Sequence, residues 1–165
     1  MSAYSAADWD GFGATAATAA ATLTGLLFIA VSINLKQILN ERNLPGRAAQ
    51  TLVFFGLPLI FALLLVVPGQ ARAALGGELI AAGVVALATA LVVDHRAGRS
   101  PEEPRWSRQL TRIVPMTGSC ACLIVAGVSL AAQAGGGLYW LVPATVFTIF
   151  AGLVNTWVLL VEILR

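Results

Sequence analysis

The stretch Ala14–Leu35, ATAATAAATLTGLLFIAVSINL, contains no charged residue. An α-helix of about 20 apolar residues spans the hydrocarbon core of a bilayer, so this stretch predicts a membrane-spanning helix. The rest of the chain has the same character, since 58% of its residues are hydrophobic and only 11% are charged. We therefore predict an all-α, polytopic integral membrane protein.

Four further apolar stretches are long enough to be spans. The five predicted spans are, in chain order, 14–35, 50–67, 73–93, 110–132 and 138–164. A four-span alternative, which merges or drops the second or the third, stays open at this point. The longest loop, 94–109, is too short for a soluble domain. We therefore expect residues 1–165 to form a single transmembrane helical domain.

The cations predict the orientation of the chain. With five spans and the amino terminus outside, every one of the ten Lys and Arg residues except Arg72 lies on the cytoplasmic side, as the positive-inside rule requires. Arg165 would lie outside if there were only four spans. The amino-terminal tail has no Lys or Arg and carries Asp8 and Asp10, which is unlike the start of a signal peptide. We expect an outside amino terminus and a cytoplasmic carboxyl terminus.

Composition also suggests where the protein resides. There is a single Lys against nine Arg, and Ala is abundant, a bias typical of GC-rich bacterial genomes. We predict a multi-pass protein of a bacterial inner (plasma) membrane. The net charge of +2 is explained by cytoplasmic loops that face anionic lipid, so the predicted partner is the lipid bilayer rather than nucleic acid.

The scarce polar and small residues form stripes at heptad spacing, each along one face of a helix. In the first span the stripe comprises Thr15, Thr18, Thr22, Gly25, Ile29, Ser32 and Lys36. In the fifth span it comprises Thr145, Thr148, Gly152, Asn155, Leu159 and Glu162. The fourth span has a weaker version at Pro115, Ser119, Cys122, Ala126, Ser129 and Gln133.

Two interpretations of the stripes stay open. Small and hydroxyl-bearing residues mediate close packing between membrane helices, and they can also line a path for water or ions. In either case we expect the first, fourth and fifth spans to form a polar interior. Thr18 and Thr22 would then face protein or water, and Leu23 and Leu27 would face elsewhere. The second and third spans would lie more toward lipid, with the Phe54–Phe55 and Leu63–Val67 faces exposed to it.

Three ionisable residues lie close to the ends of spans, where charge is rare and often functional. Glu78 is near the outer end of the third span. We expect it to be either an interfacial carboxylate within reach of lipid headgroups or a cation-attracting or proton-binding carboxylate at a subunit contact. Lys36 and Glu162 are near the inner ends of the first and fifth spans, which run in the same direction. Their placement predicts either a structural ion pair between Lys36 and Glu162 or a ring of charged side chains at the inner mouth of a pore.

Catalytic and cofactor signatures are missing from the sequence. Cys120 and Cys122 point to different faces of one helix, and His95, the only histidine, lies in a charged loop. We therefore predict no enzymatic activity, no metal site and no cofactor. The preferred function is a homo-oligomeric channel or pore for ions or small solutes. The alternative is a non-catalytic accessory or assembly subunit of a larger membrane complex, bound to partner subunits.

Overall fold

The computed structural model describes residues 2–40, 44–97 and 113–163, and its secondary structure within these ranges is entirely helical. Five helices are long and apolar enough to cross a membrane, which confirms the predicted number. They are α1 (Asp10–Ile33), α3 (Leu44–Leu65), α4 (Arg72–Ala97), α6 (Val114–Ala132) and α7 (Leu141–Ile163).

In the part of the chain that the structure describes, three short helices flank the spans. The 3₁₀ helices η1 (Ala6–Trp9) and η3 (Gly137–Trp140) lead into α1 and α7. The third, α2 (Leu35–Asn40), follows α1 after a bend at Asn34, whose φ and ψ are −104° and 16°. The Asn34 side chain donates a hydrogen bond of 2.9 Å to the Ala30 carbonyl, so this carbonyl in the last turn of α1 has a side-chain partner.

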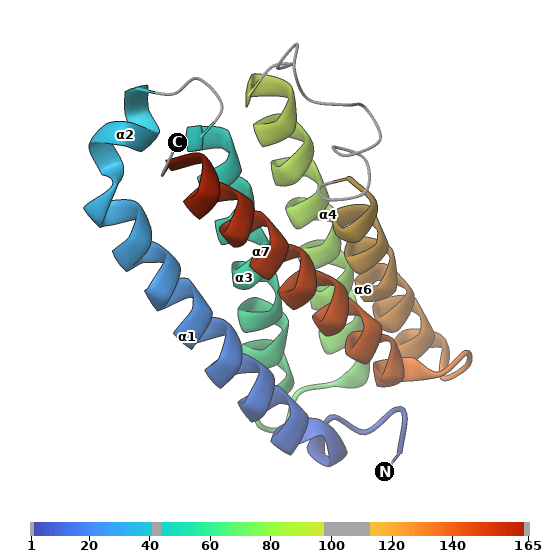
Figure 1. The fold of residues 1–165 in the computed structure, drawn as a ribbon. Coiled ribbons are helices and arrows are strands. Elements are labelled where there is room, and N and C mark those ends of the chain that lie inside the picture. The colour runs from blue at the N-terminus through green and yellow to red at the C-terminus, as the bar shows by residue number, and fades with distance from the viewer. Residues whose placement is uncertain (1, 41–43, 98–112, 164–165) are drawn as a thin grey trace.

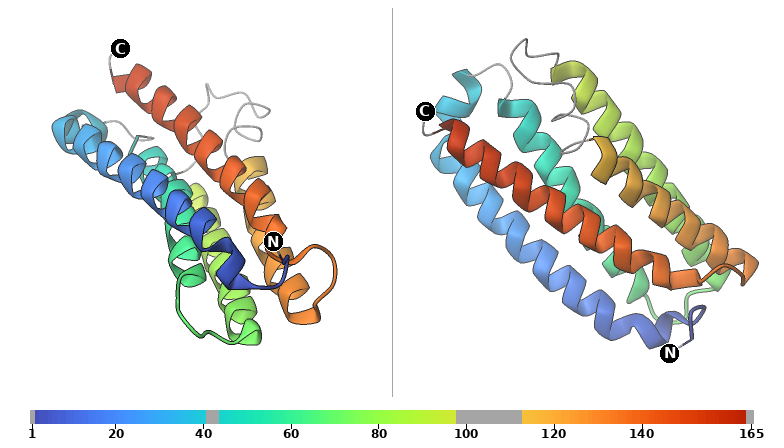
Figure 2. Two further views of the ribbon diagram at one scale, coloured as in Figure 1. Left: turned by 90° about the horizontal axis from the view of Figure 1, so that it is seen from below. Right: turned by 45° about the vertical axis from the view of Figure 1, so that its right-hand side comes forward.

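Four helices form an antiparallel bundle, and α1 lies against its side (Figures 1 and 2). Around the bundle α3 contacts α4, α4 contacts α6, α6 contacts α7, and α7 contacts α3, and α1 packs chiefly on α3. The amino-terminal segment and the α3–α4 and α6–α7 links gather at one end, which we call the outer end after the predicted orientation. The opposite end, where α2 lies, is called the inner end.

The second span begins earlier than the sequence suggested. Its helix starts at Leu44, whereas the predicted span began at residue 50, so Pro45 lies in the first helical turn. Proline is well tolerated in the first helical turn, where its missing N–H would have no partner anyway. Pro58 also lies within α3.

The second span occupies the centre of the molecule, so the prediction that it faces lipid was wrong. The side chains of Phe54 and Phe55 are 0% and 1% exposed. A helix that is apolar all round can be enclosed by other helices as well as by lipid, and hydrophobicity alone does not separate the two. For the second span the prediction holds only in part of its outer end, where Leu63, Val66 and Val67 are exposed but Leu65 is buried.

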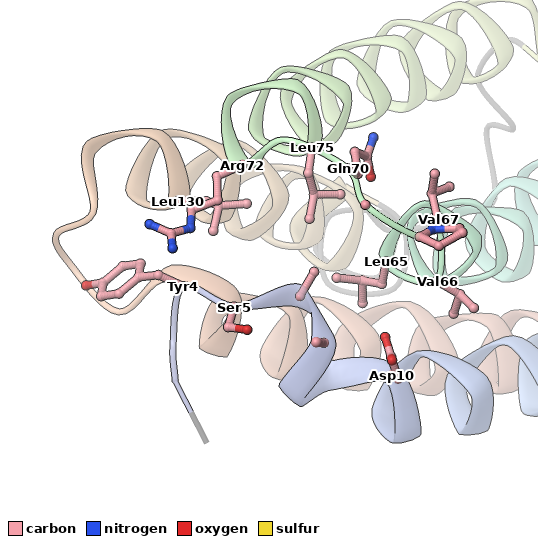
Figure 3. A pocket seen from close by; sticks show the side chains of 14 residues that line it. Tyr4, Ser5, Asp10, Leu65, Val66, Val67, Gln70, Arg72, Leu75 and Leu130 are labelled. Carbon is pink, nitrogen blue, oxygen red and sulfur yellow. The ribbon is translucent and has the colours of Figure 1, made fainter.

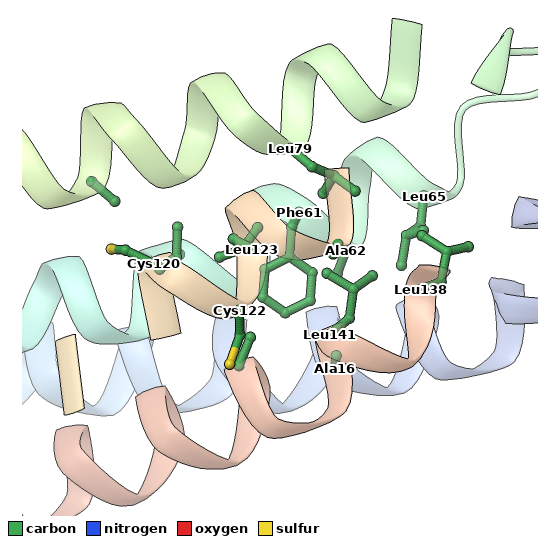
Figure 4. Packing of buried hydrophobic residues seen from close by; sticks show 14 of the residues in the cluster. Ala16, Phe61, Ala62, Leu65, Leu79, Cys120, Cys122, Leu123, Leu138 and Leu141 are labelled. Carbon is green, nitrogen blue, oxygen red and sulfur yellow. The ribbon is translucent and has the colours of Figure 1, made fainter. Parts of the chain in front are cut away.

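The apolar core lies between the four bundle helices (Figure 4). Phe61 of α3, Leu79 of α4, Leu123 of α6 and Leu141 of α7 are each 0% exposed and belong to one cluster. Such dense contact gives each side chain many small dispersion interactions, which are a main source of stability between helices in lipid.

Candidate functional site

The polar stripe of α7 faces the interior of the bundle. Thr145, Thr148 and Asn155 are 9%, 0% and 2% exposed. The Thr145 hydroxyl donates to the Leu141 carbonyl at 2.7 Å, and the Thr148 hydroxyl reaches the Ala144 carbonyl at 3.0 Å. Both hydroxyls are therefore satisfied by their own helix, as membrane burial requires.

Asn155 joins α7 to α3 near the inner end. Its Nδ2 donates to Thr51 Oγ1 at 2.7 Å and to the Arg47 carbonyl at 3.3 Å. The Thr51 hydroxyl in turn donates to the Arg47 carbonyl at 2.9 Å. Asn155 was predicted as a lining or interface residue, whereas Thr51 and Arg47 were not predicted. The signal available was that Thr51 is the only hydroxyl-bearing residue in 51–67.

The weaker stripe of α6 is also buried over most of its length. The Ser119 hydroxyl donates to the Ala144 carbonyl of α7 at 3.0 Å. Ser129 Oγ accepts a hydrogen bond from the Gly137 backbone at 2.7 Å, which fixes the link into η3. Only Gln133, just beyond the helix end, is exposed. This stripe holds helices together within one copy of the chain.

The stripe of α1 faces away from the bundle. Its polar and small members are all exposed: Thr15, Thr18, Thr22, Gly25 and Ser32. Leu27, which was expected to face elsewhere, is instead 1% exposed and belongs to an apolar cluster. The prediction that the α1 stripe forms part of the interior was therefore wrong for the single chain.

The reason is that α1 carries small residues on two faces. The face that packs on α3 includes Gly13, Ala16 and Ala20, all buried. A Cβ placed on Gly13 would lie 3.3 Å from the Ala62 carbonyl oxygen, so the two backbones approach closely there. Small residues favour such approach wherever they occur, and the sequence could not say which small face α3 covers.

The exposed threonines of α1 do not present unsatisfied hydroxyl donors. Thr15, Thr18 and Thr22 each donate a hydrogen bond of 2.8 Å to the carbonyl four residues earlier in the helix. Each hydroxyl oxygen keeps a lone pair for a further donor. This outward face, which we call the α1 stripe, can therefore contact lipid, another helix or water without leaving a donor unpaired.

The predicted charge pair at the inner end stays a prediction. Lys36 is exposed on α2, and the side chain of Glu162 lies outside the described residues. In the inner half, Leu27 of α1 and Leu159 of α7 belong to one apolar cluster with Leu44, Ala48 and Phe55 of α3. The two parallel helices are thus both packed against α3.

The outer end has its own polar contacts. Glu78 Oε2 accepts a hydrogen bond of 2.5 Å from Gln70 Nε2, in the link before α4. The amino-terminal segment is tied to the α6–α7 link, because the Leu138 backbone donates to the Ala3 carbonyl at 2.8 Å. Trp9 and Tyr139 add an edge-to-face ring contact with centroids 5.0 Å apart. Glu78 is therefore engaged within the protein.

Among the described residues, no three His, Cys, Asp or Glu side chains come together in a group that could hold a metal ion. Comparison of the chain with protein-family models, with curated proteins and with solved structures found no match.

Proposed function

We propose that the protein is a homo-oligomeric channel or small-solute pore of a cell membrane, in which α1 of each copy faces a shared axis. The observation that carries this proposal is the exposure of the α1 stripe. Most polar side chains in the stripes of α6 and α7 are buried inside the bundle. Thr15, Thr18, Thr22 and Ser32 of α1 are exposed, so they could contact another copy or water.

The packing of the bundle favours a path between copies over a path through one copy. The positions where a central path would run are filled by side chains such as Phe61 and Leu123, both 0% exposed. The buried hydroxyl donors of Thr145 and Thr148 are bonded to carbonyls of their own helix. In an oligomer with closed rotational symmetry, the α1 stripe of every copy would face the shared axis.

Lys36 extends the stripe onto α2 at the inner end, and it is exposed. In a ring of copies this residue would place positive charge at the inner mouth, where charge selects among permeant ions. If Glu162 pairs with Lys36, the mouth would be closer to neutral. The ion selectivity of the proposed pore therefore depends on that pair.

An accessory or assembly subunit is the second candidate. It is favoured by the small side chains of the α1 stripe and by threonine hydroxyls that already bond to their own helix. A face of this kind suits close packing against a helix, which could belong to a different membrane protein. In that case the stripe would be covered and would conduct nothing.

The mass of the purified particle in nanodiscs separates the two candidates. A closed ring of identical chains supports the pore, and a stoichiometric companion protein supports the accessory role. Flux of ions and of small neutral solutes into proteoliposomes then tests conduction directly. A monomer without flux would contradict the pore.

Substitution within the stripe adds a matched comparison. Thr22→Leu places a bulky side chain at the proposed contact, whereas Thr89→Leu changes an exposed threonine of α4 that also bonds to its own helix, at 2.8 Å. We expect Thr22→Leu to lower oligomer yield and flux while Thr89→Leu leaves both unchanged. Equal effects of the two substitutions would mean that the α1 stripe has no special role.

A further inference from the structure

The outward face of α1 changes character halfway along the helix. From Gly11 to Gly25 every exposed residue is small, and these residues are Gly11, Ala14, Thr15, Thr18, Ala21, Thr22 and Gly25. From Leu26 to Ile33 the face is bulky and apolar, since four side chains are at least 55% exposed: Leu26, Phe28, Ile29 and Ile33. Ile29 is the member of the α1 stripe that lies in this bulky part. The stripe is therefore apolar at one level and polar or small on either side of it.

The part of the stripe on the outer side of Ile29 has both room and hydrogen-bond acceptors. A Cβ added to Gly11 or to Gly25 would meet nothing within 4 Å. The three threonine hydroxyls between these glycines donate to carbonyls of their own helix, so each oxygen offers a lone pair to a further donor. Water can therefore be held along this part of the stripe. The Ile29 side chain has no polar atom and cannot hold water in the same way.

A pocket of about 320 Å³ at the outer end does not continue as a path through the bundle. It lies between the amino-terminal segment and the α3–α4 link (Figure 3). Its polar lining residues come from these two parts of the chain: Tyr4, Ser5, Asp10, Gln70 and Arg72. Its lining also includes three leucines of the packed core, each 1% or 2% exposed: Leu65, Leu75 and Leu130. A solute in this pocket therefore meets the apolar core, and the α1 stripe remains the surface on which a path can run.

We propose that Ile29 forms the barrier of the pore, and that the pore passes small uncharged solutes in preference to ions. This inference rests on the proposed function, because Ile29 surrounds a path only where α1 of every copy faces the shared axis. Closed symmetry then places one Ile29 side chain from each copy at the same level. A ring of apolar side chains is a constriction that loses water readily and closes by dewetting.

An apolar ring discriminates by charge, because an ion loses far more solvation free energy than an uncharged group when it leaves water. The Ile29 ring supplies no dipole or charge that could replace the water around an ion. An uncharged solute such as urea gives up only hydrogen bonds, and it regains them at the threonine oxygens on one side and at Ser32 on the other. The ring therefore raises the barrier for ions more than the barrier for uncharged solutes.

Cysteine accessibility locates the barrier. In a Cys120→Ala, Cys122→Ala background, a single cysteine replaces either Thr22 or Ser32, which lie on opposite sides of Ile29 along the helix. A charged, membrane-impermeant methanethiosulfonate is applied to the outer side in intact cells and to the inner side in inverted vesicles. Because the reagent needs a thiolate in water, Thr22→Cys should react only from the outer side and Ser32→Cys only from the inner side. Adding Ile29→Thr should allow Ser32→Cys to react from the outer side as well.

Val85→Cys is the control, because Val85 is 63% exposed on α4, away from the proposed axis, and should react from neither side. Reaction of Thr22→Cys and Ser32→Cys from the same side, with Ile29 in place, would overturn the barrier but not the pore. Reaction of neither cysteine from either side would contradict the pore itself, and the barrier with it. The failure of this inference is thus distinguishable from the failure of the proposed function.

Flux measurements test the selectivity, in proteoliposomes of phosphatidylethanolamine and phosphatidylglycerol with urea as the uncharged probe and K⁺ as the ion. We expect urea to pass more readily than K⁺. Ile29→Thr should raise the K⁺ flux about tenfold, equivalent to about 1.4 kcal/mol off the barrier, and should change the urea flux less. Val85→Thr introduces the same hydroxyl on α4 and should change neither flux.

The oligomer mass and the helical content by circular dichroism establish that each variant assembles and is folded. A K⁺ flux that exceeds the urea flux in the unsubstituted protein, or that Ile29→Thr leaves unchanged, would overturn the selectivity. Should Ile29→Thr fail to assemble, the two-sided comparison of Thr22→Cys with Ser32→Cys keeps Ile29 and still decides whether the barrier lies there.

Discussion

Gly127 of α6 faces Gly76 of α4 so closely that a Cβ added to Gly127 would lie 2.4 Å from the Gly76 carbonyl oxygen. The reverse addition, to Gly76, would lie 2.8 Å from the Gly127 carbonyl oxygen. Real Cβ atoms do not approach this near, so the two helices can meet here only because both residues are glycine. In lipid, where no hydrophobic force drives helices together, this close contact stabilises the α4–α6 pair.

Gly127→Ala should therefore destabilise the protein, by about 1–3 kcal/mol, because the methyl group forces the helices apart. The measurement is chemical or thermal unfolding in detergent, followed by tryptophan fluorescence. Gly77→Ala is the control, since a Cβ at Gly77 meets nothing within 4 Å. That change should be neutral or slightly stabilising, because alanine is the better helix former. Equal destabilisation by both would contradict the close α4–α6 contact.

Phe55 and Gly152 make a second contact of this kind, between α3 and α7. A Cβ on Gly152 would lie 2.3 Å from Cε1 of the Phe55 ring, which is 1% exposed and has little room to move. We expect Gly152→Ala to cost about 1–3 kcal/mol in the native background. The same substitution should cost less in a Phe55→Leu background, because the smaller side chain makes space. An unchanged cost in that background would show that the ring is not what meets the new methyl group.

Asn155 and Thr51 should be energetically coupled, because their side chains share a hydrogen bond of 2.7 Å between α7 and α3. A double-mutant cycle with Asn155→Ala and Thr51→Val measures this coupling. Interhelical bonds in membranes average about 0.6 kcal/mol, with a maximum of about 1.7 kcal/mol, and we expect a value in this range.

The control for that cycle is Thr156→Val, since the Thr156 hydroxyl donates to the Gly152 carbonyl of its own helix, at 2.8 Å. Its coupling to Asn155→Ala should be close to zero. Coupling that is larger for Thr156 than for Thr51 would contradict the α3–α7 bond.

The predicted threading is open to a direct test. In a Cys120→Ala, Cys122→Ala background, single cysteines replace Ser2 and Lys36, both exposed. A membrane-impermeant maleimide should label the first in intact cells, and should label the second only after the membrane is permeabilised. This follows from the distribution of cations, which places all but Arg72 inside. Labelling of both from the same side would rule out the predicted passage of the first span.

The polar residues at the outer end could be predicted from the sequence only in part. Glu78 stood out as a charge within a span, but its partner Gln70 and the flanking residues Asp10 and Arg72 did not. Each of them is an ordinary polar residue at the end of an apolar stretch. They line one pocket only because the amino-terminal segment folds beside the α3–α4 link, some 60 residues away in the sequence.

The sequence by itself determined the number of long apolar helices and their approximate positions. The reason is that a span needs about 20 apolar residues, and that requirement is local. The sequence also marked the stripes of α6 and α7, which the bundle buries, because polar groups in a membrane protein need partners.

Only the tertiary structure decided which helices lie at the centre. The largely apolar α3 is enclosed, and the polar α1 stripe is left outside, the reverse of the expectation. Lipid is as apolar as a protein core, so composition cannot say whether a leucine or phenylalanine faces lipid or another helix. What decided it was the fit of surfaces, such as the backbone of Gly13 against Ala62 and the ring of Phe55 against Gly152. Such fits depend on contacts between segments that are distant in the chain, and no local pattern encodes them.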